Sequence, residues 1–254
     1  MRAGDLERVR ALPMFSGLDD HSYAAITGSA FLQRFPANTQ LLLEGDPVDF
    51  LYVLLEGQVE LSGSWNDKET VLTILRPVST FILAAVVLDA EALMAARVLE
   101  RSEMLMIPGE AIRARMDDDA AFSVAVAREL AGCYRGLVRT IKNQKLRSGV
   151  ERLANYLLQL RERNGSDRFT LPHEKRILAS LLGMAPENLS RAFQTLRPYG
   201  VDVQGAEVSL RLVADLLRLA KPDALIEKPA EQRGDAVAEF EAEIAAARQI
   251  PVSR

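Results

Sequence analysis

Residues 175–200 read KRILASLLGMAPENLSRAFQTLRPYG, and this stretch decides the fold of the C-terminal part of the chain. Apolar residues recur at helical spacing on both sides of Gly183, which predicts two helices joined by a short turn. Glycine supplies the positive φ that such a turn often requires. The residues expected to pack the first helix are Ile177, Leu178, Leu181 and Leu182.

The second helix of this pair has one apolar face and one polar face. Residues early in a recognition helix enter the major groove, where Arg191 can contact guanine and Glu187 can accept a hydrogen bond from cytosine. Ser190 can donate or accept. The inward residues are Leu189, Phe193 and Leu196, and the candidate DNA-reading residues are Glu187, Asn188, Ser190, Arg191 and Gln194.

Taken alone, this stretch also fits a helical hairpin with a solvated polar face. Local charge favours DNA, because residues 147–221 carry 12 Lys/Arg against eight Asp/Glu, a net charge of +4, in a chain of 254 residues whose net charge is −4. The positive charge therefore lies where phosphate contacts would need it. The candidate phosphate contacts are Lys175, Arg176 and Arg197.

The segments on either side extend the pattern to a winged helix-turn-helix over 148–221. Ser148 and Glu151 have the spacing of a capping box, which predicts a new helix near residue 149. A short strand pair is expected around 201–210, after the second helix, and FTLP at 169–172 belongs to the same unit. Helix, turn, helix and hairpin follow in the order of that motif.

The N-terminal part has the pattern of a β-sandwich or roll. Residues 1–28 are expected to form short helices, with Ser16 and Asp19 as caps. Between 29 and 110, short apolar runs alternate with turn signals at a spacing of roughly ten residues. We assign residues 1–116 to this domain. The expected strands include FLYVLL (50–55), VEL (59–61), TVLTIL (70–75) and MLMI (104–107).

A long helix is expected from Asp118 to Lys145, within a dimerisation and hinge segment at 117–147. Its apolar residues repeat every three or four positions and form one stripe. A helix of that length exceeds what a small β domain covers, so a second copy of the helix is the expected partner. The alternative is a helix packed wholly on its own β domain. The stripe consists of Phe122, Val126, Leu130, Cys133, Leu137 and Ile141.

Composition excludes several classes of protein. One cysteine, Cys133, rules out an intrachain disulfide, an iron–sulfur cluster and a cysteine-rich zinc site, and two histidines disfavour a histidine metal cage. No phosphate-binding loop, catalytic Ser/His/Asp set or metal-ligand cluster is present, so no enzyme is expected. The longest apolar run, residues 81–88, is too short for a membrane span, and no secretory signal is recognisable, so the cytoplasm is the expected compartment.

Residues 10–220 resemble the CRP/FNR family of bacterial transcription regulators, an α+β fold with a cyclic-nucleotide-binding-like β-roll sensor, a long dimerisation helix and a winged helix-turn-helix. EGDPVDFLYVLLEGQVEL (44–61) is similar to the family's glycine-bounded hairpin, and LGMAPENLSRAFQTL (182–196) to its recognition helix. The pattern Glu187-x-x-Ser190-Arg191 resembles the FNR-type subset. The resemblance implies a homodimer on a two-fold site with TTGAT-like half-sites, with RNA polymerase as a partner if the protein is an activator.

The sensor departs from the cyclic-nucleotide subset of the family. Leu83 and Ala84 occupy the positions of the subset's Gly-Glu pair, its Arg-Ser-Ala motif is missing, and Arg97 lies after the place that this motif requires. An apolar lining cannot neutralise a phosphate, so we expect no tight binding of cyclic nucleotide. The expected effector pocket is lined by Phe81, Leu83, Val86, Met94 and Arg97.

Such an apolar pocket resembles the FixK, DNR and FtrB members of the family, some of which are associated with haem. Cys133 is then a candidate haem ligand or redox-sensitive thiol, against the alternative of a buried residue at the dimer seam. A regulatory module acting on a protein partner is the other class of function considered. The C-terminal extension at 222–254 contains an acidic helical pattern at 235–249, and its role stays open.

Overall fold

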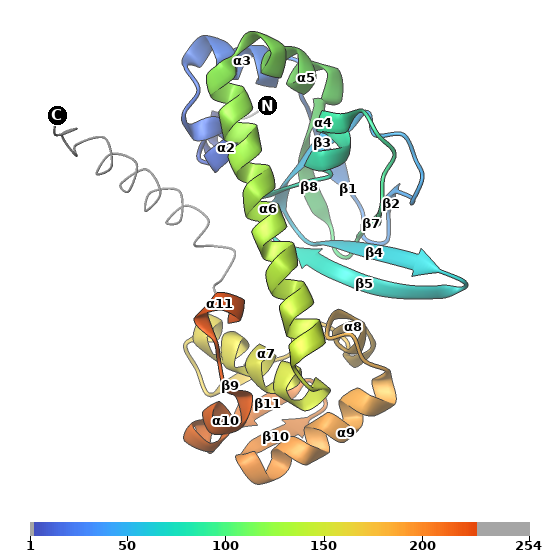
Figure 1. Cartoon of the computed structure of the whole chain (residues 1–254), viewed down its shortest axis with the longest axis vertical. Coiled ribbons are helices and arrows are strands. Elements are labelled where there is room, and N and C mark those ends of the chain that lie inside the picture. The colour runs from blue at the N-terminus through green and yellow to red at the C-terminus, as the bar shows by residue number, and fades with distance from the viewer. Residues whose placement is uncertain (1–2, 228–254) are drawn as a thin grey trace, which may run out of the picture. The chain divides into compact units, whose positions relative to one another are not determined.

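The computed structural model describes residues 3–227 (Figure 1). These residues divide into two compact units. Of the described residues, the first unit comprises those up to Ala131 together with Leu171–Arg191, and the second comprises Gly132–Thr170 together with those from Ala192 onward. The acidic helix expected at 235–249 lies outside the described residues. Over the described part of the chain, no helix is both long and apolar enough to cross a membrane.

Short helices open the first unit, as the sequence predicts. Asp19 caps the third of them, because its carboxylate accepts a hydrogen bond from the Ser22 amide at 2.7 Å, and this bond lowers the pKa of Asp19. Ser16 is not a cap; it ends the second helix. The helices are α1 (Ala3–Arg10), α2 (Pro13–Ser16) and α3 (Asp20–Thr27).

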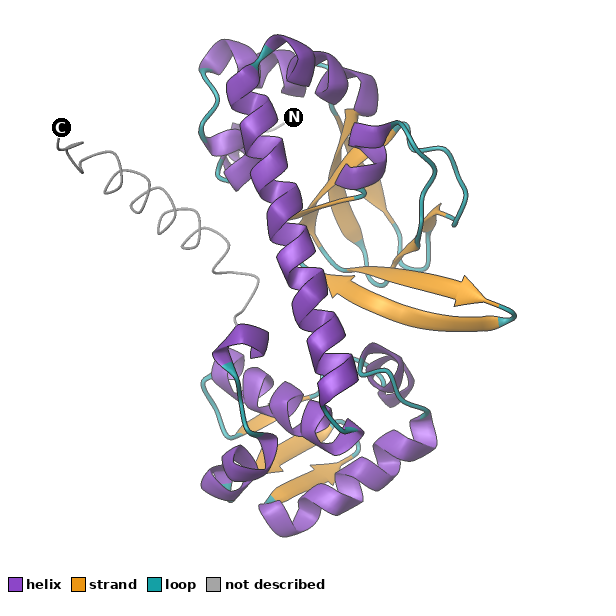
Figure 2. Ribbon diagram, viewed as in Figure 1, coloured by secondary structure: helices purple, strands orange, loops and turns teal. Residues whose placement is uncertain are grey.

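Two four-stranded sheets follow and confirm the β-rich prediction. Their strand orders are β1-β8-β3-β6 and β2-β7-β4-β5, with antiparallel pairing throughout. The hairpin β4–β5 extends beyond the other strands (Figure 2). The strands are β1 (Phe31–Phe35), β2 (Gln40–Leu42), β3 (Phe50–Glu56), β4 (Val59–Trp65), β5 (Lys68–Leu75), β6 (Ser79–Phe81), β7 (Ala95–Val98) and β8 (Ser102–Pro108).

Successive side chains of β3 point alternately into two different apolar cores, which explains why its sequence is an unbroken apolar run. Tyr52 and Leu54 point into a core between the two sheets, together with residues such as Val59 and Val98. Leu51 and Val53 belong to a different core, which includes residues of the short helices. Both faces of β3 are therefore buried, and every position along it can be apolar.

Gly57 joins β3 to β4 at the position where the sequence places a hairpin glycine. Its φ is +90°, and a Cβ atom there would lie 2.2 Å from Ser102 Oγ and 2.7 Å from the Arg101 carbonyl oxygen. Both the backbone conformation and the close approach of the neighbouring chain require glycine.

The long predicted helix is present as α6 (Ala120–Leu146), preceded by α4 (Leu83–Leu88) and α5 (Gly109–Asp118). It begins two residues later than expected, because Asp119 accepts hydrogen bonds from the amides of Ala121 and Phe122 at 2.9 and 3.1 Å and so acts as a cap. These bonds, the one to Phe122 most strongly, lower the pKa of Asp119.

The expected stripe on α6 divides into two parts. Phe122 and Val126 are fully buried in the core of their own sensor domain, and Leu130 packs partly against it. The expectation that Phe122 and Val126 contact a second chain therefore needs correction, since these side chains hold α6 on its own β domain. The other part of the stripe, Cys133, Leu137 and Ile141, is exposed.

The helix that follows α6 begins with the capping box that the sequence predicts. The Ser148 hydroxyl accepts a hydrogen bond from the Glu151 amide at 3.3 Å, and the Glu151 carboxylate accepts one from the Ser148 amide at 2.8 Å. The elements that lie wholly in the second unit are α7 (Gly149–Asn164), β9 (Arg168–Thr170), 3-10 helix η1 (Arg197–Tyr199), β10 (Val201–Gln204), β11 (Glu207–Leu210), α10 (Val213–Ala220) and α11 (Ala224–Glu227). The sheet order is β10-β11-β9, which supplies the expected wing.

Candidate DNA-binding surface and effector site

Two short helices carry the predicted recognition motif, α8 (Lys175–Leu181) and α9 (Pro186–Leu196). Gly183 adopts φ +62° between them, as the tight turn requires. The Met184 amide donates to the Ala179 carbonyl at 3.0 Å and closes the end of α8. Pro186 opens α9 at the first helical position, where its missing amide hydrogen costs nothing.

The two faces of α9 are as the sequence predicts. Leu189, Phe193 and Leu196 are buried, while the polar residues between them are exposed. Ser190 makes one local bond, in which its hydroxyl donates to the Pro186 carbonyl at 3.1 Å and leaves the oxygen able to accept. The exposed polar residues are Glu187, Asn188, Ser190, Arg191 and Gln194.

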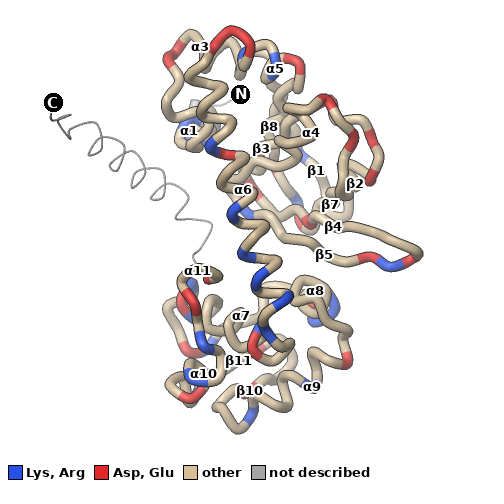
Figure 3. The backbone as a smooth tube through the Cα atoms, in the orientation of Figure 1, with Lys and Arg blue, Asp and Glu red and all other residues tan. Residues whose placement is uncertain are grey.

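Basic residues adjoin this motif in sequence. Lys175 and Arg176 form the first turn of α8, Arg197 follows α9 directly in η1, and all three are exposed. Figure 3 shows basic residues at α8 and repeatedly along the second half of α6, and acidic residues on α3 and α5. The exposed cations at α8 and η1 are suited to phosphate contacts.

The tip of the wing lies between β10 and β11, within the strand pair predicted at 201–210. Residues 204–207 are exposed and read Gln-Gly-Ala-Glu, so the tip carries no cation. Gly205 adopts φ +63° at the turn, and Arg211 pairs with Asp202 at 2.7 Å across the hairpin. The exposed side chains of this motif that suit base edges therefore lie on α9 rather than at the wing tip.

Two of the expected effector-pocket residues line the core between the sheets. Phe81 is buried and stacks on Tyr52 with ring centroids 5.0 Å apart, and Met94 packs against the same core. Burial raises the pKa of Tyr52. The sequence prediction omits Tyr52, although the alternation of 50–55 places it on the same face as Leu54. This core is apolar and aromatic in character.

Leu83 and Val86 do not line that core. Both lie on α4 and are buried in the separate core that contains the short helices. Ile82, with φ +65°, is the turn residue before α4, and the chain changes direction there. The expected pocket therefore needs correction, because its residues are divided between two cores.

Arg97 also lies outside the core between the sheets. Its neighbours Ala96 and Val98 point into that core, so Arg97 points to the opposite face of the sheet. There its Nη2 donates to Glu60 Oε1 at 2.6 Å, and this bond raises the pKa of Arg97. The Glu60 side chain is only 2% exposed. Arg97 therefore balances a buried carboxylate and is unavailable to a ligand in the roll.

Residues 3–227 contain no group of three His, Cys, Asp or Glu side chains that could hold a metal ion. Cys133 is exposed on α6 of a single chain, on the part of the predicted stripe that also carries the exposed Leu137 and Ile141. Within one chain this thiol therefore does not offer a haem an apolar surrounding.

An exposed apolar surface runs along the second half of α6. Successive members are separated by three, one, three and five residues, so they cover a broad face of the helix rather than a single narrow stripe. Tyr134, for example, is 68% exposed. The surface consists of Tyr134, Leu137, Val138, Ile141 and Leu146, of which only Leu137 and Ile141 belong to the predicted stripe.

Comparison with known proteins identifies two domains in the chain. Residues 32–119 match the cyclic nucleotide-binding domain, and residues 151–219 match the Crp-like helix-turn-helix domain. A CRP-like cAMP-activated global transcriptional regulator of Mycobacterium tuberculosis is 25% identical over 215 residues, which cover 82% of this chain and 95% of that protein.

Solved structures share the fold. A putative transcriptional regulator of the CRP/FNR family from Eubacterium rectale has a TM-score of 0.69 at 17% identity, covering 83% of this chain and 99% of its own. FixK2 from Bradyrhizobium japonicum has a TM-score of 0.65 at 20% identity, covering 77% of this chain and 99% of its own. With both domains matched in the same order, the chain belongs to the CRP/FNR family of transcription regulators, a non-enzymatic family that binds DNA.

Proposed function

We propose that this protein is a homodimeric, sequence-specific transcription regulator that reads a two-fold DNA site through α9 of each protomer. The exposed polar face of α9, with Arg191 among residues suited to base edges, is the observation that carries the proposal. Two such helices reach successive major grooves about 34 Å apart when the dimer axis matches that of the DNA.

In vitro selection from a random DNA pool tests this directly. We expect the selected sequences to converge on an inverted repeat with TTGAT-like half-sites, with centres one helical turn or a multiple of it apart. Selection of a single half-site would contradict the two-fold arrangement. No enrichment over the starting pool would contradict sequence-specific reading and would favour the second candidate, a regulatory module for a protein partner.

We propose that the exposed apolar surface of α6 is the dimer seam. Association of two such helices would bury Tyr134, Leu137, Val138, Ile141 and Leu146, which otherwise face water. An effector that changes how these helices pack would then act through the hinge at Leu146–Ser148 and reorient the DNA-binding domains.

The effector is proposed to be a small apolar or aromatic molecule rather than a cyclic nucleotide. In support, Phe81, Tyr52 and Met94 give the core between the sheets an apolar lining, and Arg97 is held by Glu60 on the opposite face. A cyclic phosphate placed in that core would lose its hydration without gaining a cation.

Titration calorimetry with cAMP and cGMP distinguishes this proposal from activation by cAMP, which the name of the mycobacterial relative states for that protein. We expect no heat of binding at micromolar nucleotide. Micromolar affinity for either nucleotide would overturn the proposal for the effector and leave the proposal for DNA reading intact.

A further inference from the structure

The hinge between α6 and α7 contains a buried charge. Arg147 follows the last residue of α6, yet its side chain is only 8% exposed. A guanidinium removed from water in this way is costly unless hydrogen bonds and an opposite charge compensate it. The residues that bond to the Arg147 guanidinium therefore determine how firmly the hinge between α6 and α7 is held.

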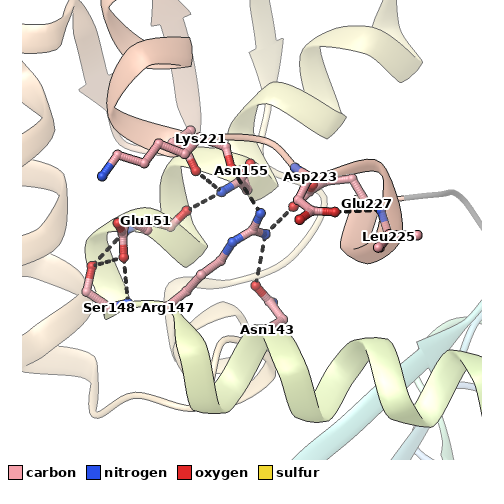
Figure 4. A network of polar contacts seen from close by, with 10 residues as sticks. Asn143, Arg147, Ser148, Glu151, Asn155, Lys221, Asp223, Leu225 and Glu227 are labelled. Carbon is pink, nitrogen blue, oxygen red and sulfur yellow. Dashed lines mark hydrogen bonds and ion pairs between the residues drawn. The ribbon is translucent and has the colours of Figure 1, made fainter.

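The opposite charge comes from the C-terminal extension, and a further hydrogen bond comes from the residue just before it (Figure 4). Arg147 donates to the Glu227 carboxylate, and Glu227 is itself only 15% exposed. A second bond runs to the Lys221 carbonyl at 3.3 Å, and a third to Asn143 Oδ1 at 3.2 Å on α6. Two of these three partners lie beyond residue 219, where the helix-turn-helix match ends.

Residues 221–227 form a compact turn that presents the Glu227 carboxylate to Arg147. Lys221 adopts φ +46° and reverses the chain after α10. The Asp223 carboxylate accepts from the Leu225 amide at 2.7 Å, and the Asp223 amide in turn donates to Glu227. Glu227 is therefore held by the turn with one oxygen while it meets Arg147 with the other.

The same network fastens this turn to α7. Asn155 is buried and donates to the carbonyls of Ala220 at 2.7 Å and Glu151 at 2.9 Å, which ties the end of α10 to the first turns of α7. From α7, Arg152 donates to the Arg147 carbonyl at 2.6 Å and covers the end of α6. Arg147 is thus held by hydrogen bonds to both its backbone carbonyl and its side chain.

We propose that residues 221–227 are a latch that restricts the hinge between α6 and α7, with the Arg147–Glu227 ion pair as its closure. The latch gives the C-terminal extension a role in setting the freedom of the DNA-binding domain. It goes beyond the proposed function, because it concerns the hinge and does not depend on the effector or on the DNA sequence.

Hydrogen exchange of the full-length protein tests the latch with the variant Glu227→Gln, which keeps the shape and removes the charge. We expect amides in residues 144–152 to exchange about 10- to 100-fold faster, as loss of a charge-assisted hydrogen bond implies. Protection of α9 and of the β10–β11 hairpin should be unchanged. A truncation after Lys221 should give the same pattern.

Asp215→Asn is the matched control. It removes the charge from another ion pair of this unit, with Arg218, whose own side chain is 80% exposed. This variant should leave exchange in 144–152 at the wild-type rate. Wild-type exchange at the hinge in both Glu227→Gln and the truncation would overturn the proposal. Equal loss of protection in α9 would also overturn it, because the segment would then stabilise the whole domain rather than restrict the hinge.

Discussion

Replacing Arg97 by alanine should destabilise the sensor domain even though no ligand is present. The change removes the cation from Glu60, whose side chain is 2% exposed and whose Oε2 already lacks a hydrogen-bond partner among the described residues. Leaving a buried carboxylate unpaired costs several kcal/mol, but the Arg97 side chain is 43% exposed, so water screens part of the site. We expect the free energy of unfolding to fall by about 2 kcal/mol.

The reverse change should cost less. Glu60→Gln removes the charge but keeps an acceptor, and the half-exposed Arg97 can be hydrated, so we expect a loss of about 0.5–1 kcal/mol. Combining Glu60→Gln with Arg97→Ala leaves no unpaired carboxylate at position 60. The double variant should therefore be more stable than Arg97→Ala alone, although it carries one more substitution.

Urea unfolding followed by far-UV circular dichroism at neutral pH measures these differences. Asp89→Asn is the control, since it alters the Asp89–Arg113 pair, in which the Asp89 side chain is 71% exposed, and should change stability little. If Arg97→Ala were as stable as Glu60→Gln, or if the two changes were additive, Glu60 would not depend on Arg97. The assignment of Arg97 to the outer face of the sheet would then fail.

Three further predictions concern other parts of the chain. Gly57→Ala should lower the free energy of unfolding by more than about 2 kcal/mol, whereas Gly17→Ala, with no atom within 4 Å of its Cβ, should be nearly neutral in the same urea assay. Ser148→Ala should cost about 1 kcal/mol. The hydrogen bond from the Ser148 amide holds the pKa of Glu151 below its ordinary 4.5. The ionised carboxylate therefore stabilises the fold fully above about pH 4.5, and this stabilisation is lost as the pH falls through the lowered pKa. Thermal melts between pH 3 and 6 will follow this loss of stability. Leu137→Glu combined with Ile141→Glu should convert a dimer into a monomer in light scattering, and a dimer of unchanged mass would contradict the proposed seam.

The recognition motif is predictable because its pattern is local. Gly183 and the apolar spacing of Leu189, Phe193 and Leu196 depend only on neighbouring residues, and the structure places each of them as expected. The capping box at Ser148 and Glu151 is local in the same sense. Short-range hydrogen bonds and helical periodicity suffice for such features.

The effector site depends on contacts between distant segments, and the sequence predicts it less well. The face on which Arg97 lies is set by the pairing of β7 with β4, since a shift of one residue moves a side chain to the other face. The stripe on α6 is one pattern in sequence, yet Phe122 and Val126 meet the sensor core while Leu137 and Ile141 remain exposed. Helical periodicity identifies an apolar face but not the surface that covers it.

The most direct test of sequence-specific reading by α9 is the affinity of the wild type and of Arg191→Ala for two DNA duplexes. One duplex carries TTGAT-like half-sites, and in the other the G·C base pair of each half-site is replaced. Fluorescence anisotropy at one fixed salt concentration supplies the dissociation constants. We predict that the wild type prefers the intact duplex and that Arg191→Ala loses about 1–3 kcal/mol of affinity per half-site together with that preference. If Arg191→Ala discriminated between the two duplexes as fully as the wild type, α9 would not read the site through Arg191.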